Sequence, residues 1–224
     1  PGGNDYSSVF GKALCAHAAK DERICAITAA MRDGTGLRAF SEQFPERFFD
    51  VGIAEEHAVA FAGGLAVSGL LPVCALYSTF AQRTYDQLIH DVALQKLHMV
   101  LALDRAGFVA GDGETHQGVF DCSFLSEIPG VEIYAPDSFE ELETALTRAI
   151  AGTGISVLRY PRGGMSTYDR TAFVPFNAQS ASYFSVCDRF SSQTPELALV
   201  TYGKETAQVF AAAKCLSEKG ISVR

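Results

Sequence analysis

Short apolar runs alternate with amphipathic stretches over residues 7–159 of this chain. The apolar runs predict strands because each is brief and bounded by polar residues or glycine. The stretches between them carry apolar residues at the i, i+3, i+4 and i+7 spacing of helices. This alternation is typical of an α/β fold with a doubly wound parallel sheet and helices on both faces. The expected strands are 24–28, 47–53, 72–77, 99–104, 131–135 and 155–159, and the expected helices are 7–20, 37–44, 56–69, 80–96 and 138–151.

The alternation stops near residue 163, so residues 1–163 are predicted to form one α/β domain. Residues 164–195 are rich in small and polar residues with isolated aromatics, which indicates an interdomain linker. A new pattern of strand 196–202 and helix 204–219 predicts the beginning of a second α/β domain at 196–224. About thirty residues cannot bury a core of their own, so we expect this second domain to be truncated and the chain to be part of a longer protein.

Composition excludes several classes of protein. The chain has 224 residues, of which 48% are hydrophobic and 20% charged, as in an ordinary globular protein. Its formal net charge of −8 argues against nucleic-acid binding, and no apolar stretch is long enough to span a bilayer. The six cysteines form no C-x-x-C pair. We therefore expect reduced cysteines, a cytosol-like compartment and no zinc site.

The junction at residues 50–57 is the most informative local feature. An apolar, strand-like run breaks directly into a helix that begins with Glu55 and Glu56. A carboxylic acid in apolar surroundings has its charged form disfavoured, so it can hold and exchange a proton at neutral pH, as acid–base or cofactor-activating chemistry requires. The alternative is that both acids are solvated and complement the helix dipole, and local sequence alone favours it.

Four arginines lie at or near the carboxyl ends of predicted strands, where ligands collect in such sheets. Arginine suits carboxylates and phosphates because its guanidinium donates two parallel hydrogen bonds. In an acidic protein this grouping indicates a small anionic ligand, although four unrelated surface residues would give the same pattern. The four are Arg83, Arg105, Arg159 and Arg162.

Two loops supply the remaining candidates. The strand-to-helix turn after Tyr77 carries hydroxyls and Phe80, which is either a platform for a flat ring or a hydrophobic staple of the helix. The glycine-rich loop after Asp104 carries Asp112 and His116, and we expect both near a substrate. Its Gly-Asp-Gly has no asparagine at the spacing of a divalent-metal motif, so no metal site is predicted there.

Seven strings in the chain closely resemble the 1-deoxy-D-xylulose-5-phosphate synthases, which are thiamine diphosphate-dependent relatives of transketolase. The resemblance runs from about residue 6 to residue 163 and is weaker through the tail. The most specific strings are those that start at Tyr77 and at Asp112. The seven are Ala29-Ala-Met-Arg-Asp-Gly, Phe44-Pro-Glu-Arg-Phe-Phe-Asp-Val-Gly-Ile-Ala-Glu-Glu-His-Ala, Tyr77-Ser-Thr-Phe-Ala-Gln-Arg, His90-Asp-Val, Asp104-Arg-Ala-Gly, Gly111-Asp-Gly-Glu-Thr-His-Gln-Gly and Arg159-Tyr-Pro-Arg-Gly.

The resemblance implies a pyrimidine-binding domain followed by the start of a C-terminal domain. Glu55 matches the glutamate that hydrogen-bonds N1′ of the cofactor's aminopyrimidine, Phe80 matches the ring that stacks on it, and Ile53 is placed beside them. Catalytic roles are implied for Glu55, Asp112 and His116. Substrate-binding roles around the acceptor phosphate and in the substrate cavity are implied for Tyr77, Arg83, Arg105, Arg159 and Arg162.

The resemblance also implies a reaction, in which pyruvate is decarboxylated and condensed with D-glyceraldehyde 3-phosphate in isoprenoid and thiamine biosynthesis. It implies a homodimer in a bacterial cytoplasm or plastid stroma. The ligands of Mg²⁺ and of the diphosphate are expected in an N-terminal domain outside this chain, so the chain alone is predicted to be inactive. The alternatives are a transketolase, an α-keto-acid dehydrogenase β subunit, or a non-catalytic α/β interaction domain.

Overall fold

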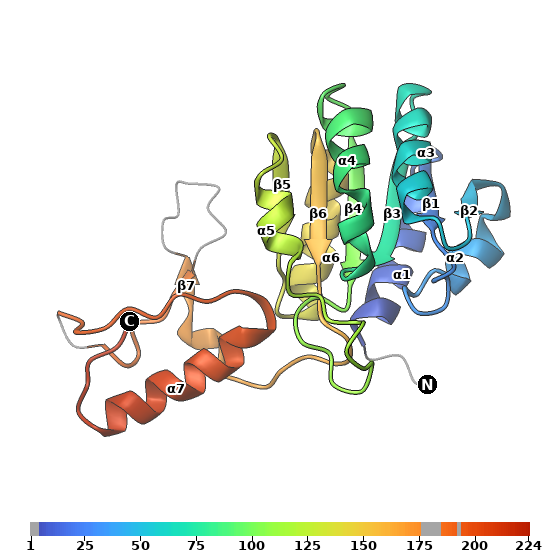
Figure 1. Ribbon diagram of the computed structural model, residues 1–224. Coiled ribbons are helices and arrows are strands. Elements are labelled where there is room, and N and C mark those ends of the chain that lie inside the picture. The colour runs from blue at the N-terminus through green and yellow to red at the C-terminus, as the bar shows by residue number, and fades with distance from the viewer. Residues whose placement is uncertain (1–4, 176–184, 192–193) are drawn as a thin grey trace. The chain divides into compact units, whose positions relative to one another are not determined.

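The computed structural model describes residues 5–175, 185–191 and 194–224. The chain divides into two compact units, Pro1–Met165 and Ser166–Arg224. The first unit is built on a six-stranded parallel sheet with the order β2-β1-β3-β4-β6-β5 (Figure 1). Its strands are β1 Ile24–Thr28, β2 Phe48–Asp50, β3 Leu71–Tyr77, β4 Met99–Asp104, β5 Val131–Tyr134 and β6 Ile155–Arg159.

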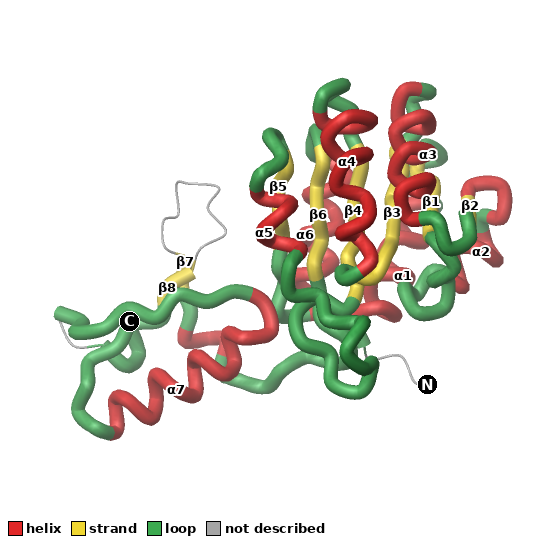
Figure 2. Tube along the Cα trace, viewed as in Figure 1, coloured by secondary structure: helices red, strands yellow, loops and turns green. Residues whose placement is uncertain are grey.

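Helices cover both faces of this sheet (Figure 2). Three pack on one face: α1 (Tyr6–Ala18), α2 (Arg38–Gln43) and α6 (Phe139–Ala151). The other face carries α3 (Glu55–Val67), α4 (Tyr85–Gln87) and α5 (Asp121–Ser126). The central strands are apolar and buried at nearly every position, as expected for parallel strands that are covered on both sides.

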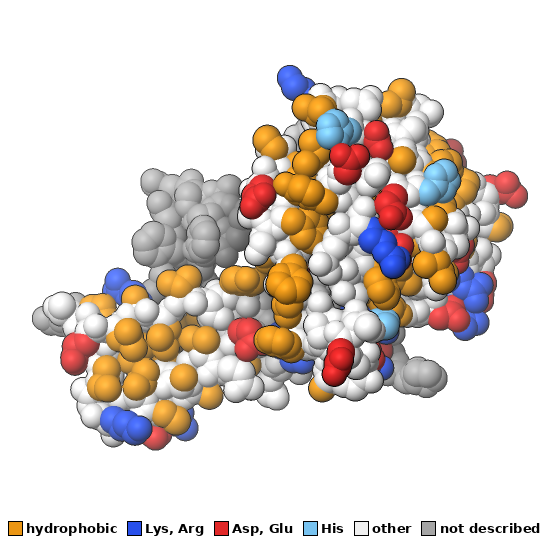
Figure 3. All heavy atoms as spheres, viewed as in Figure 1, with side chains coloured by type: hydrophobic (Ala, Val, Ile, Leu, Met, Phe, Trp, Pro, Cys, Tyr) orange, Lys and Arg blue, Asp and Glu red, His pale blue; other side chains and the backbone are white. Residues whose placement is uncertain are grey.

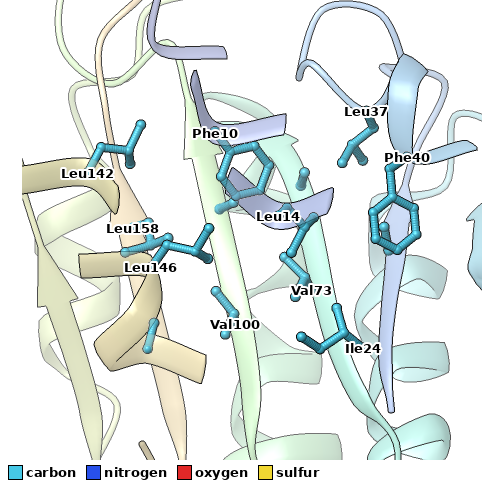
Figure 4. Close-up of a cluster of buried hydrophobic side chains, with 14 of the residues drawn as sticks. Phe10, Leu14, Ile24, Leu37, Phe40, Val73, Val100, Leu142, Leu146 and Leu158 are labelled. Atoms are coloured by element: carbon cyan, nitrogen blue, oxygen red, sulfur yellow. The ribbon is translucent and has the colours of Figure 1, made fainter. Parts of the chain in front are cut away.

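The core beneath α1 and α6 shows how the apolar pattern is used. Phe10 and Leu14 of α1, together with Leu146 of α6, point onto the strands, where they meet residues such as Val100 of β4 (Figure 4). The start of α6 is fixed by Ser138, whose hydroxyl accepts a hydrogen bond from the backbone N–H of Glu141. These contacts hold the carboxyl ends of the strands at one edge, where the glycine-rich loop lies (Figure 1).

The predicted fold class is confirmed, and most predicted elements match the observed ones within two residues. The helix expected at 80–96 is wrong in detail: it is a 3-10 helix Phe80–Thr84, then α4, then a π-helix Leu88–Ala93. Apolar spacing cannot separate these helix types because their periods are close. Helix α5 was not predicted, since six residues are too short for a periodic signal.

The second unit contains the short strands β7 (Val174–Pro175) and β8 (Ser185–Val186), a 3-10 helix Arg170–Ala172, another at Gly203–Glu205, and α7 (Thr206–Glu218). The predicted helix 204–219 is therefore present. The predicted strand 196–202 is wrong, because its backbone pairs only with Ser222–Arg224 through one isolated bridge between Leu197 and Val223. Part of the predicted linker, at 176–184 and 192–193, lies outside the described residues.

The six cysteines all lie among the described residues and form no disulfide there. Three of them, Cys15, Cys25 and Cys74, are buried, and burial raises the pKa of the Cys25 thiol to about 11. A thiol that stays protonated at neutral pH is a poor nucleophile and metal ligand. No helix in the described part of the chain is both long enough and apolar enough to cross a membrane.

Candidate active site

The candidate site lies at the carboxyl ends of β1, β3 and β4. The chain passes from β1 outward to β2 and then returns to place β3 on the other side of β1, so β1 and β3 flank a topological switch point. Ligands of doubly wound sheets bind at such points. Strand register brings Tyr77 at the end of β3 opposite Asp104 at the end of β4. The sheet therefore sets side chains from distant parts of the sequence next to one another.

Glu55 is the first residue of α3, and its side chain is only 2% exposed. The predicted burial is thus confirmed for Glu55, whereas Glu56 is exposed, as the helix-cap alternative expected of both acids. The Glu55 carboxylate is not in purely apolar surroundings, however, because Nη1 of Arg83 donates a hydrogen bond to Oε2 at 2.8 Å. That hydrogen bond raises the pKa of the Arg83 guanidinium, whose side chain is half-exposed.

Three aromatic rings form a cluster beside this pair. Tyr77 stacks on Phe80 with ring centroids 6.0 Å apart, and His116 meets Phe80 edge-on at 5.1 Å. The guanidinium of Arg83 lies 5.7 Å from the centre of the Phe80 ring, so the acid, the arginine and the ring are neighbours. Nδ1 of His116 lies 2.8 Å from the hydroxyl of Thr115, which fixes the imidazole. The turn and the loop predicted separately from sequence are therefore one cluster.

Arg105 is held above Tyr77 in an unusual backbone conformation. Its φ of 61° lies in the left-handed region, which non-glycine residues rarely adopt. Its guanidinium stacks on the Tyr77 ring at 3.7 Å. Nε donates to Oδ2 of Asp112 at 3.0 Å, while Nη1 donates to the carbonyl of Gly34 at 3.1 Å and to Oδ1 of Asp104 at 3.2 Å. These contacts fix the guanidinium between the Tyr77 ring and the Asp112 carboxylate.

Asp112 brings a second arginine to the same place, because Arg162 also donates a hydrogen bond to its carboxylate. Arg105 is nearly buried and Arg162 is about half exposed, so the pair runs from the floor of the site toward solvent. Burial raises the pKa of the Tyr77 hydroxyl at the same point. Two guanidinium groups that converge on one carboxylate are suited to bind an anion that competes with it.

Arg159 is directed elsewhere, although the sequence grouped it with the other arginines. Its Nε and Nη2 donate to the two carboxylate oxygens of Asp121 at 3.0 and 3.1 Å. Asp121 is buried and also accepts a hydrogen bond from Ser78 at 3.0 Å. The structure therefore joins Arg159 to α5 and to the end of β3, and does not bring it to Asp112.

Ile53, also predicted beside the cofactor, is 80% exposed and makes no ring contact or hydrogen bond in the described residues. Leu94 and Phe120 are also exposed. Figure 3 shows hydrophobic side chains scattered over the side of the molecule in view. His57 stacks on Phe61 at 6.0 Å. These two side chains line a pocket of about 450 Å³ together with Phe48, Phe49, Asp50 and Val51.

Two residues that support the loop, Gln117 and Gly118, were assigned no role from the sequence. Gln117 clamps the glycine-rich loop by accepting from the backbone N–H of Val109 and donating to the carbonyls of Val109 and Gly113. Gly118 leaves no room for a side chain, since a Cβ would lie 2.4 Å from the carbonyl oxygen of Arg105. No cluster of three or more metal-ligating side chains is found among the described residues. The spacing of Gln117 and Gly118 from Asp112 could have suggested a structured loop, but not which backbone groups these two residues contact.

Comparison with known proteins decides the family. The family description "Transketolase, pyrimidine binding domain" matches residues 3–166, which is most of the chain. The chain belongs to the transketolase pyrimidine-binding domain family. Within this family it is similar to proteins named 1-deoxy-D-xylulose-5-phosphate synthase. One from Clostridium kluyveri is 48% identical over 99% of this chain and 34% of its own length, and one from Magnetococcus marinus is 59% identical over 72% of this chain and 26% of its own.

A solved structure of a "Split gene transketolase, inactive beta4 tetramer" has a TM-score of 0.80 to this chain. It is 26% identical, and the match covers 100% of this chain and 70% of that one. The chain spans about a third of the length of the curated relatives it matches.

Proposed function

We propose that this pyrimidine-binding domain serves a 1-deoxy-D-xylulose-5-phosphate synthase, which joins pyruvate to D-glyceraldehyde 3-phosphate with loss of carbon dioxide. The observation that carries the proposal is the buried Glu55 carboxylate, joined through Arg83 to the Phe80 ring. Relatives that carry the synthase name, at 46–59% identity, support the choice of reaction. Bacterial cytoplasm or plastid stroma is the compartment we propose.

The residues present fit an aminopyrimidine ring. Glu55 offers a carboxylate that can face a ring nitrogen, and it accepts a hydrogen bond only from Arg83 among the described residues, so it has capacity for another partner. Phe80 offers a flat apolar face beside it. When bound, thiamine diphosphate supplies the electron sink for decarboxylation and carbon–carbon bond formation. Glu55 would hold a proton opposite the ring nitrogen, and Phe80 would fix the plane of the ring.

The arginine pair fits the anionic groups of the substrates. We assign Arg105 and Arg162 to the phosphate of the aldehyde, because both already donate to one carboxylate, that of Asp112. Arg83, half-exposed at the rim, is assigned to the carboxylate of pyruvate. His116 lies beside both Phe80 and Tyr77, and we assign it the transfer of a proton to or from a substrate oxygen. Arg159 is assigned a supporting role through Asp121.

The remaining partners lie outside the described residues. No described cluster could hold Mg²⁺, so we propose that the metal and the diphosphate are bound by another domain of the protein. Exposed apolar side chains on the face with α3 and α4, such as Ile53 and Leu94, support burial against that domain or against a second subunit. A homodimer is the assembly that we propose for the whole enzyme.

A chimera tests the function directly. Residues 1–224 replace the homologous third of the Clostridium kluyveri synthase, and carbon dioxide release from pyruvate is measured with and without D-glyceraldehyde 3-phosphate. We expect release that the aldehyde stimulates and that Glu55→Gln abolishes. The matched control is Glu56→Gln, because its neighbouring carboxylate is exposed. A folded chimera that binds thiamine diphosphate but ignores the aldehyde would contradict the proposal.

Transketolase activity is the second candidate, supported by the likeness to the split-gene transketolase. The same chimera separates the two functions, because a transketolase takes its two-carbon unit from a ketose phosphate and releases no carbon dioxide. Turnover of xylulose 5-phosphate in place of pyruvate would favour transketolase.

A further inference from the structure

Asp104 is a buried carboxyl that the proposed reaction does not use. It is the last residue of β4 and is fully buried. The hydroxyl of Ser7 in α1 donates to its Oδ2 at 2.5 Å, and Nη1 of Arg105 donates to its Oδ1 at 3.2 Å. Asp104 therefore touches the arginine that is assigned to substrate phosphate, but from the protein side.

Two of the three guanidinium nitrogens of Arg105 donate hydrogen bonds to described residues, and the third does not. Nε serves Asp112 and Nη1 serves Asp104 and the carbonyl of Gly34, whereas Nη2 donates no hydrogen bond to any described residue. Stacking on Tyr77 and the left-handed backbone leave the guanidinium little freedom to turn. The two carboxylates of Asp104 and Asp112 thus already offset the guanidinium charge that would attract an anion to Nη2.

We propose that Asp104 is a positioning residue that orients Arg105 and, by gaining or losing a proton, sets how strongly Arg105 binds an anion. With Asp104 ionised, two carboxylates offset the charge of Arg105, and an anion binds weakly. With Asp104 protonated, one negative charge is removed from the site, while the acid still holds its place through Ser7. This inference rests on the anion-binding role proposed above for Arg105.

The environment of Asp104 places this change near neutral pH. Burial raises the pKa of Asp104 to about 6, against the opposing effects of the Ser7 hydrogen bond and of Arg105. Other groups that act on it or beside it are Asp5 before α1, the buried Tyr160 hydroxyl, and Tyr77. His116 is a second ionisable side chain of the site and lies 6.2 Å from Tyr77, so the experiment must remove it.

Sulfate is a suitable probe, because it is a tetrahedral dianion that keeps its charge across this pH range. Binding to the chain in a His116→Gln background is followed by NMR at the Arg105 and Arg162 side chains. We expect sulfate affinity to fall roughly fivefold between about pH 5 and pH 7.5 as Asp104 ionises. Asp104→Asn should bind sulfate at both pH values as tightly as the parent does at the lower one. The matched control is Asp86→Asn, an exposed acid paired with His90.

A second measurement keeps the test decisive if Asp104→Asn does not fold. The ¹³C carboxyl signal of Asp104 is titrated in the unsubstituted chain, with and without saturating sulfate. Because linkage is reciprocal, sulfate should raise the midpoint of Asp104. An unmoved midpoint, or the full pH dependence surviving in Asp104→Asn, would overturn the inference. Absence of any sulfate effect on Arg105 and Arg162 would instead refute their proposed role as anion ligands.

Discussion

Two buried carboxylates at the same end of the molecule are paired with arginine in different ways. Asp121 accepts two hydrogen bonds from Arg159, a third from Ser78 and a fourth from the backbone N–H of Cys122. Glu55 accepts one, from Arg83, among the described residues. Arg159 is 12% exposed, whereas Arg83 is 50% exposed. In the Asp121–Arg159 pair, which we call the closed pair, the acid has its acceptor positions filled and the arginine is little exposed. In the Glu55–Arg83 pair, which we call the open pair, the acid has unused acceptor positions and the arginine is half-exposed.

The difference in partners supports the ligand-binding role proposed for Glu55. A carboxylate has about four acceptor positions, so Asp121 is saturated and its environment leaves nothing for a ligand. Glu55 is buried to the same degree yet retains unused acceptor positions, and such incomplete satisfaction in a native protein calls for an explanation. A ligand that donates to Glu55 supplies one. Burial of an acid is therefore weaker evidence for function than the count of its partners.

The closed pair should be the more costly to break. Asp121→Ala removes both hydrogen bonds between the carboxylate and the part-buried guanidinium of Arg159, and the Ser78 hydroxyl loses its acceptor. We expect the free energy of unfolding to fall by about 3 to 5 kcal/mol in urea titrations. Asp86→Ala, at an exposed pair with His90, is the control and should change it by less than about 1 kcal/mol. Equal effects would contradict the distinction between the two kinds of pair.

Asp104 provides an intermediate case, because it is buried beside an arginine but its pKa is raised to about 6 by burial. The unfolded carboxyl titrates near its model value of 3.8, so the folded state prefers the protonated acid. The contribution of Asp104 to stability is then complete below about pH 3.8 and is lost as the pH rises through about 6. The loss should reach about 2 to 3 kcal/mol. Urea titrations near pH 4.5 and pH 7.5 give the free energy of unfolding of the unsubstituted chain and of Asp104→Asn. The difference between the two proteins should change with pH, and a constant difference would contradict the prediction.

Gly118 lies between the two arginine systems and tests whether they are packed together. A Cβ there would be 2.4 Å from the carbonyl oxygen of Arg105 and 2.5 Å from Oγ of Ser78, which hydrogen-bonds to Asp121. We expect Gly118→Ala to destabilise the chain by about 1 to 3 kcal/mol, because neither neighbour can retreat without breaking a contact. Gly64→Ala is the control. A Cβ added there in α3 would meet no atom within 4 Å apart from the neighbouring backbone of its own helix, so the substitution should be neutral or stabilising in thermal unfolding.

The comparison also shows what the sequence could reveal. The burial of Glu55 did not follow from local sequence, which favoured a solvated acid, but from its place at the carboxyl end of a predicted strand together with the family resemblance. The separate fates of Arg83 and Arg159 were not predictable, since both follow strands and only the fold shows which acid each one meets. Asp121 lies in the short helix α5, which leaves no periodic trace. The sheet was readable because its signal repeats along the chain, whereas each partner in the site is a single long-range contact.

The open pair should give the smallest effect on stability and the largest on chemistry. In Glu55→Gln the side chain keeps its shape, and the half-exposed Arg83 can turn to water, so we expect the free energy of unfolding to change by no more than about 1 kcal/mol. In the chimera, carbon dioxide release should fall roughly 100-fold or more, because an amide cannot hold the proton that the carboxylate holds. Urea titration and the release assay on the same protein separate the two effects. A loss of stability comparable to that of Asp121→Ala would mean that Glu55, like Asp121, serves mainly to stabilise the fold. It would contradict the distinction between the two pairs.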